Sequence, residues 1–144
     1  MSVENPKNLE ANLAMHVINL QSKIQKRAGQ PLSLHGIGLS EYLVLDRLQA
    51  APGNKLRRSD LAEQVGLSPS GVTRLLNPME KIGLIAKEEN PRDARVSLVT
   101  LTAAGRQVAA ETSKSFEQAM GTLFKSLDHT QMATLSDLLR SVLA

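Results

Sequence analysis

The stretch GLSPSGVTRLLNPMEKIGLI, residues 66–85, has the pattern of one amphipathic helix with a small, polar beginning. Ser68 is a favourable N-cap, and Pro69 follows at the first helical position, where its missing N–H costs nothing. The apolar side, predicted to seat the helix on the domain, comprises Val72, Leu75, Leu76, Met79 and Ile82. The opposite, polar side carries Ser70, Thr73, Arg74 and Asn77.

The residues on either side of this stretch predict a winged helix-turn-helix. A short helix over Arg58–Val65 ends at Gly66, where a left-handed C-cap is wanted. Ala62 is small where the two helices cross, and Val72, six residues after Gly66, fills the angle between them. Short helical hairpins can imitate that spacing, but the ribbon that follows favours the winged motif. Its parts are the strands LIAKEE (84–89) and RVSLVTLT (95–102) and the turn NPRD (90–93).

The polar side of the helix has the chemistry of a recognition helix, which enters the DNA major groove with its N-terminal end leading. The small first turn from Ser68 to Gly71, with its free N–H groups and the positive end of the helix dipole, suits a phosphate. Thr73 can contact a thymine methyl group or a base acceptor, and Arg74 can read guanine. Asn77 can pair with adenine one turn deeper. The alternative is that Ser-Pro-Ser only caps the helix and Arg74 is a solvated charge.

Two neighbouring features leave alternatives open. Pro78 removes the hydrogen bond to the carbonyl of Arg74, which costs about 3 kcal/mol in a helix interior. The helix therefore either bends there, beyond the DNA-contacting turns, or restarts. Lys55, Arg57 and Arg58 form a basic cluster that is ordinarily solvated. Beside a recognition helix, Arg58 can instead contact a phosphate.

The segments before and after the winged region predict further helices. Apolar residues recur with a helical period over 7–27, whereas Gly, Pro and Ser predict a loop over 28–38. The predicted caps are Ser40 for a helix over 41–49, Thr102 for a long helix, and Asp128, paired with Gln131 in a capping box, for a last helix over 130–143.

The terminal helices carry more apolar surface than one chain needs, and such surplus usually finds another subunit. We therefore expect a homodimer; the alternative is that these helices pack only within one chain. The predicted fold is mainly α with a small β-wing (α+β). Its parts are N-terminal helices (1–54), a winged helix-turn-helix (55–105) and C-terminal dimerisation helices (106–144).

Composition limits the class of protein. A chain of 144 residues, 42% hydrophobic and 22% charged, is typical of a soluble globular domain. Without Cys it has no disulfide, thiolate metal site or thiol switch, so we expect a reducing cytoplasm. The start, MSVENPKN, lacks the regions of a signal peptide, and no apolar run approaches the roughly 18 residues of a membrane span.

Charge is concentrated in the middle of the chain. Residues 55–106 carry nine basic and six acidic side chains, a net +3, against +1 for residues 1–54 and −1 for 107–144. This distribution favours a polyanion as the partner.

The run DLAEQVGLSPSGVTRLLNPMEKIGLI, followed by NPRDAR and VTLTAAG, resembles the MarR family of bacterial transcriptional regulators over the whole chain. The family's Asp-x-Arg wing tip matches Asp93 and Arg95, with Arg92 beside them. The alternative for these residues is an ordinary solvated turn. The resemblance implies an obligate homodimer of the first and last helices on a pseudo-palindromic operator, with the wing arginine in the minor groove.

The resemblance also implies an effector, because many members bind a small, often phenolic or lipophilic anion that weakens DNA binding. The absence of Cys excludes the thiol-oxidation sensors of the family. The Gly-rich connection 28–38 is an unusual spacer, so ligand contacts do not transfer residue by residue. His16, His35 and Tyr42 are the candidates to edge a ligand cavity, although surface or core histidines are the commoner case.

The sequence thus predicts a sequence-specific regulator of double-stranded DNA, a repressor released by a small aromatic or lipophilic ligand. The rival is a winged-helix protein-interaction module, which would lack the polar helix face and the wing arginine. An enzyme is the weakest candidate, because no paired carboxylates or nucleophile–base pair can be assembled. The three histidines lie far apart without clustered carboxylates, so we expect neither a metal site nor a cofactor.

Overall fold

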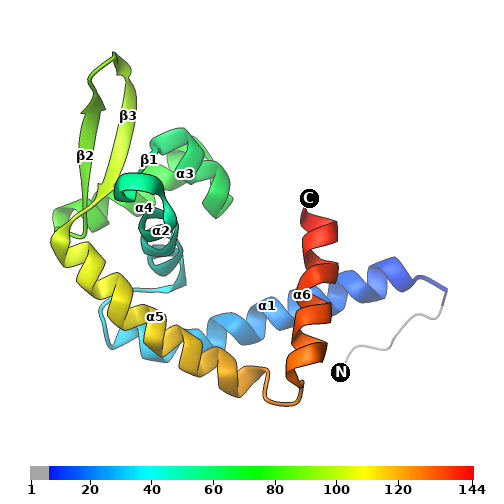
Figure 1. Cartoon of the computed structure of the whole chain (residues 1–144). Helices are drawn as coiled ribbons and strands as arrows, with labels where there is room; N and C mark the ends of the chain where they lie inside the picture. The colour runs from blue at the N-terminus through cyan, green and yellow to red at the C-terminus, as the bar shows by residue number, and fades with distance from the viewer. Residues whose placement is uncertain (1–6) are drawn as a thin grey trace.

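The computed structural model describes residues 7–144, apart from the side chain of Ala94. Helices α1 and α6, which come from opposite termini, lie together at one end of the molecule. The β2–β3 hairpin projects from the other end, and α5 runs between the two (Figure 1). In chain order the elements are α1 (Leu9–Ser33), α2 (Leu39–Ala50), the 3₁₀ turn η1 (Pro52–Asn54), β1 (Lys55–Arg57), α3 (Arg58–Val65), α4 (Pro69–Lys81), β2 (Ile85–Asn90), β3 (Asp93–Leu101), α5 (Ala103–Leu123) and α6 (His129–Leu143). The predicted mainly helical fold with a small β-wing is confirmed.

Local caps set most helix boundaries where the sequence predicts them. The Ser68 hydroxyl accepts a hydrogen bond from the Gly71 N–H at 3.1 Å, and Pro69 is the first residue of α4. The Thr102 hydroxyl caps α5 in the same way. Asp128 forms the predicted capping box with the residue three positions later. At the end of α3, Gly66 has φ 71° and ψ 34°, the left-handed conformation that favours glycine.

The first helix is longer than predicted. It continues through Pro31 to Ser33, so the prediction of a loop is wrong for residues 28–33. Ala28 and Leu32 are fully buried, four residues apart on one face of the helix. Burying a leucine stabilises by about 1.5–3 kcal/mol, which offsets most of the cost of a proline inside a helix. The remaining connection to α2 is short.

Two predictions about helix ends need correction, and one of the two alternatives at Pro78 is excluded. Ser40 does not cap α2, which begins at Leu39 with Gly38 in the cap position. Pro78 does not split the recognition helix, because α4 is one helix through to Lys81. Ile82 does not seat it either: α4 ends before Ile82, whose side chain is 64% exposed.

The sheet is small and antiparallel, with strand order β1-β3-β2. The β2–β3 pair is the predicted wing, and it includes an irregularity at Glu89/Asn90 next to the turn. β1 pairs with the other edge of β3 over three residues. This strand is not predictable from the sequence, because a strand of three residues is too short to show a periodicity.

The core lies between α2 and the winged region, and α5 closes it. Its fully buried large side chains come from every layer of the domain: Leu32, Leu45, Leu48, Leu61, Leu76, Met79, Ile85, Val44, Val72, Val99 and Thr112. The apolar side of α4 therefore seats the helix as predicted at Val72, Leu76 and Met79.

The residues that follow α4 pack closely against the start of α5, and we call this contact the Thr102–Gly105 joint. The Thr102 hydroxyl lies 2.6 Å from the carbonyl oxygen of Gly83 and 2.9 Å from that of Leu84. The Thr102 backbone N–H also donates to the Leu84 oxygen, at 3.1 Å. A Cβ at Gly105 would lie 2.0 Å from the same oxygen, so only glycine fits. The joint fixes the direction in which α5 leaves the winged region.

The two terminal helices carry unburied apolar side chains. None of the residues of α6, all of which the structure describes, is buried. Leu143 at its end is 82% exposed, and Leu9 at the start of α1 is 75% exposed. Other large apolar residues exposed on these two helices are Leu13, Met15, Val17, Ile18, Met132, Leu138 and Val142. No helix in the described part of the chain is both long and apolar enough to cross a membrane.

Candidate nucleic-acid interface

The first turn of α4 has the small, exposed surface that a close approach to a polyanion requires. Ser68, Pro69 and Ser70 are all exposed. The Ser68 and Ser70 hydroxyl oxygens lie 3.3 Å apart, and that of Ser68 already accepts the N–H of Gly71. The Ser70 hydroxyl and the other N–H groups of this turn remain at the positive end of the helix. This arrangement fits the predicted phosphate contact.

The middle of the polar face presents Thr73 and Arg74. The Thr73 hydroxyl donates to the carbonyl oxygen of Pro69 at 2.9 Å, so its proton is used within the helix. Its methyl group and oxygen lone pairs remain for a partner, which favours a thymine methyl group or a base donor over the predicted base acceptor. Arg74 is exposed and makes no hydrogen bond or ion pair with any residue that the structure describes. Its guanidinium is therefore available for guanine.

Asn77, one turn further along, is engaged with the wing. Its side-chain oxygen accepts a hydrogen bond from the ammonium of Lys87 in β2 at 3.3 Å. The sequence predicts that Asn77 pairs with adenine, and it gives no reason to single out Lys87. A long-range contact of this kind leaves no local signal in the sequence.

The wing tip is braced from within. One oxygen of the Asp93 carboxylate accepts the Arg95 backbone N–H at 3.0 Å and its side-chain Nε–H at 3.1 Å. The other oxygen lies 3.4 Å from Arg95 Nη2. Hydrogen bonds from the Arg95 side chain, and then from its backbone, lower the pKa of Asp93 below its ordinary 3.8. The carboxylate thus holds one edge of the Arg95 guanidinium, although the Arg95 side chain is 91% exposed.

Arg92 occupies the turn itself. Its backbone N–H donates to the Asn90 side-chain oxygen at 2.9 Å, which fixes the bend, and its side chain is exposed. The β2–β3 hairpin carries this tip well beyond the helices (Figure 1). The side chains of Arg92 and Arg95 are exposed and do not pack in the core, so both arginines are available to a partner.

The basic cluster before α3 divides into unlike parts. Lys55 is paired with Glu88 of β2, with its ammonium 3.2 Å from the carboxylate. Arg58 is half-buried at the start of α3 and lines a hollow of about 310 Å³ between α3 and α4. Arg58 therefore stays a candidate phosphate contact, whereas the charge of Lys55 is largely compensated.

The three candidate ligand residues do not surround one cavity. Tyr42 is buried and stacks on Phe116, with ring centroids 4.7 Å apart, and burial raises its pKa above 10.0. His35, after the end of α1, lies with Nε2 3.2 Å from the Ser115 hydroxyl and Nδ1 3.7 Å from the Glu111 carboxylate. His16 is on an exposed part of α1.

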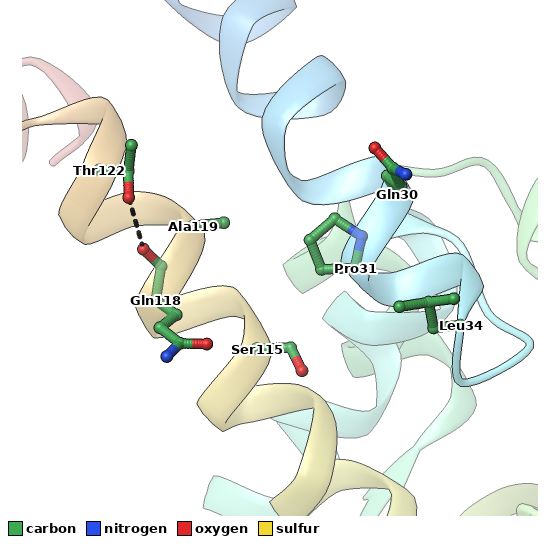
Figure 2. Close-up of a pocket in the computed structure, with 7 residues that line it drawn as sticks. All are labelled: Gln30, Pro31, Leu34, Ser115, Gln118, Ala119 and Thr122. Carbon is green, nitrogen blue, oxygen red and sulfur yellow. Dashed lines mark hydrogen bonds between the residues drawn. The ribbon is translucent and has the colours of Figure 1, made fainter.

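A groove of about 550 Å³ lies between the end of α1 and the middle of α5 (Figure 2). It is lined by Gln30, Pro31, Leu34, Ser115, Gln118, Ala119 and Thr122. His35 is connected with it through Ser115. The hydroxyl of Thr122 donates to the backbone of Gln118 across one turn of α5, so the groove wall is a regular helix.

The described residues contain no group of three or more His, Cys, Asp or Glu side chains that could hold a metal ion. What the structure brings together is a polar helix face, a free arginine on it and a wing with a braced arginine. These features define a winged helix-turn-helix protein of the kind that binds double-stranded DNA.

The chain belongs to the MarR family of transcriptional regulators, whose family model matches residues 35–96. It is 26% identical to the transcriptional repressor MprA of Escherichia coli (strain K12) over 136 residues. This alignment covers 94% of this chain and 76% of MprA. The fold is similar to that of a MarR mutant from E. coli complexed with operator DNA, with a TM-score of 0.85, 23% identity and coverage of 98% and 100%. It is also similar to the regulator PcaV of Streptomyces coelicolor in complex with its natural ligand, with a TM-score of 0.75, 24% identity and coverage of 99% and 96%.

Proposed function

We propose that this protein is a homodimeric repressor that binds a pseudo-palindromic DNA operator and is released by a small organic ligand. The observation that carries the proposal is the exposed polar face of α4, with Arg74 unpaired among the described residues, beside a wing whose Arg95 is held by Asp93. A protein-interaction module has no use for this combination. The named relatives and the DNA-bound structural neighbour support the same function.

In the proposed complex each protomer reads one half-site. The N-terminal turn of α4 enters the major groove, where Ser68, Ser70 and the first-turn N–H groups contact phosphate. Arg74 reads guanine with two hydrogen bonds, and Thr73 contacts a neighbouring base. Arg95 enters the adjacent minor groove, whose negative potential is greatest where A·T pairs narrow it. Arg58 and Arg92 add contacts to the backbone.

Dimerisation through α1 and α6 accounts for their exposed apolar side chains, since patches of this kind mark interaction sites. We assign the segments 1–54 and 106–144 to this scaffold and 55–105 to DNA binding; residues 1–6 lie outside the described part of the chain. Deleting residues 130–144 should abolish dimers and DNA binding together. Sedimentation of a folded wild-type monomer at micromolar concentration would contradict this assignment.

A ligand can release the operator only if it binds one dimer shape more tightly than another. We place the effector at the groove between α1 and α5, because the direction of α5 is fixed to the recognition helix by the Thr102–Gly105 joint. The effector would be a small aromatic or lipophilic molecule. His35 borders this site, whereas Tyr42 supports α5 from the core. We place the protein in the cytoplasm, where its DNA is.

An electrophoretic mobility-shift assay tests the proposal. The probe is the DNA upstream of the protein's own gene, with unlabelled non-specific DNA in excess. We expect a retarded complex with the mass of one dimer on one site. Retention that the competitor removes completely would favour the protein-interaction module instead. Aromatic acids that raise the melting temperature without changing operator affinity would count against ligand release.

A further inference from the structure

The wing carries a lysine whose position follows from the strand register. Lys87 in β2 lies opposite Val99 in β3, so the two side chains leave the sheet on the same face. Val99 is 1% exposed and packs in the core, which identifies this face as the one toward the helices. Lys87 lies further from the core, and its ammonium reaches Asn77 of α4. The positive charge therefore lies in the angle between the recognition helix and the wing.

The partner of Lys87 is neutral. Lys55, the other lysine beside β3, has its ammonium 3.2 and 3.3 Å from the two oxygens of the Glu88 carboxylate, which compensates its charge. Lys87 instead donates to an amide oxygen at 3.3 Å, and an amide leaves the full positive charge in place. An exposed lysine held by an amide is ordered but not neutralised. That is the condition for a contact with an anion.

Asn77 is poorly placed to read a base. It follows Arg74 by three residues on the same face of α4, about 4.5 Å further along the helix from the leading end. Reading adenine requires the amide oxygen and the amide nitrogen to face the base edge together. Here the oxygen is turned toward Lys87 and the wing. The contact that the structure shows for this oxygen is the hydrogen bond from the lysine.

We propose that Lys87 contacts a backbone phosphate at the edge of the major groove that α4 enters, and that Asn77 is a positioning residue that holds Lys87 there. This inference rests on the proposed DNA-binding function and deepens it. The phosphate contacted is the one that passes between the recognition helix and the wing. Asn77 thus contributes to affinity and carries no sequence information.

The test compares the salt dependence of operator affinity for the wild type and Lys87→Gln. Each phosphate contact contributes about 0.9 to the slope of log affinity against log salt concentration. Lys87→Gln should therefore lower the magnitude of the slope by about 0.9 per protomer. With equal affinities at 1 M salt, this is a loss of about eight-fold per protomer, or about sixty-fold per dimer, at 0.1 M salt. Lys114→Gln, the same charge change on α5, should leave the slope unchanged.

Asn77→Ala provides the second arm. It should weaken binding to all operator sequences by the same factor, and it should have little further effect in the Lys87→Gln background. A base preference that relaxes at one position in Asn77→Ala would overturn the positioning role. An unchanged salt slope in Lys87→Gln would overturn the phosphate contact. Failure of the wild type and Lys114→Gln to select any operator would instead refute the DNA-binding function itself.

Discussion

Replacing Gly105 by alanine should destabilise the protein strongly, although alanine is the better helix former. The new Cβ would lie 2.0 Å from the Leu84 carbonyl oxygen and 2.8 Å from Leu101 Cδ1, and ordinary contact begins at 3.4 Å. The Leu84 oxygen cannot move away freely, because it accepts two hydrogen bonds from Thr102. Losing both would cost about 1–3 kcal/mol, and the overpacking adds about 1–3 kcal/mol. Alanine returns about 0.5–1 kcal/mol through backbone entropy, so we expect a net loss of about 1–5 kcal/mol.

Urea unfolding measures this difference, with all proteins at one protomer concentration because association shifts apparent stability. Gly121→Ala is the matched control. It lies in the same helix with no atom within 4 Å of its Cβ, so it should be neutral or gain up to about 1 kcal/mol. If the two variants unfold with the same free energy, the close packing of α5 against the end of the recognition helix is wrong.

Four further substitutions test the interface and the core. Arg74→Ala should relax base preference at one position per half-site at a cost of about 1–3 kcal/mol, and binding-site selection will detect it. Arg95→Ala should weaken operator binding and lower its salt slope by up to about 0.9 per protomer. Asp93→Ala should also weaken binding, because it releases Arg95; tighter binding, as charge counting alone predicts, would refute the brace. Burial raises the pKa of Tyr42, so the neutral phenol contributes to the free energy of unfolding. This contribution is complete below pH 10.0 and is lost as the pH rises through the raised pKa. Tyr42→Phe should remove that part of the alkaline loss of stability.

Local chemistry made the winged region predictable. The caps at Ser68, Thr102 and Asp128 and the left-handed turn at Gly66 each depend on residues within four positions of one another. The amphipathic pattern of α4 and the wing turn are equally local. Their positions in the sequence were therefore sufficient to predict the fold class and the first turn of the recognition helix.

Tertiary packing decided what the sequence could not. α1 continues past Pro31 because Leu32 has a core to enter, and propensity alone does not contain that information. β1 exists only through its pairing with β3. The bond between Asn77 and Lys87 joins two elements across ten residues, and the sequence gives no sign of it. The stacking of Tyr42 on Phe116 is likewise a contact between two elements, which the sequence does not show.

Selection of binding sites from a random double-stranded DNA pool tests the central claim most directly. A symmetric dimer that presents α4 and the wing twice should enrich an inverted repeat, with half-sites about 10 base pairs apart from centre to centre and A·T pairs where the wing lies. A pool without enrichment after repeated rounds, or one converging on a single unrepeated site, would contradict the account of this chain as a dimeric reader of a pseudo-palindromic operator.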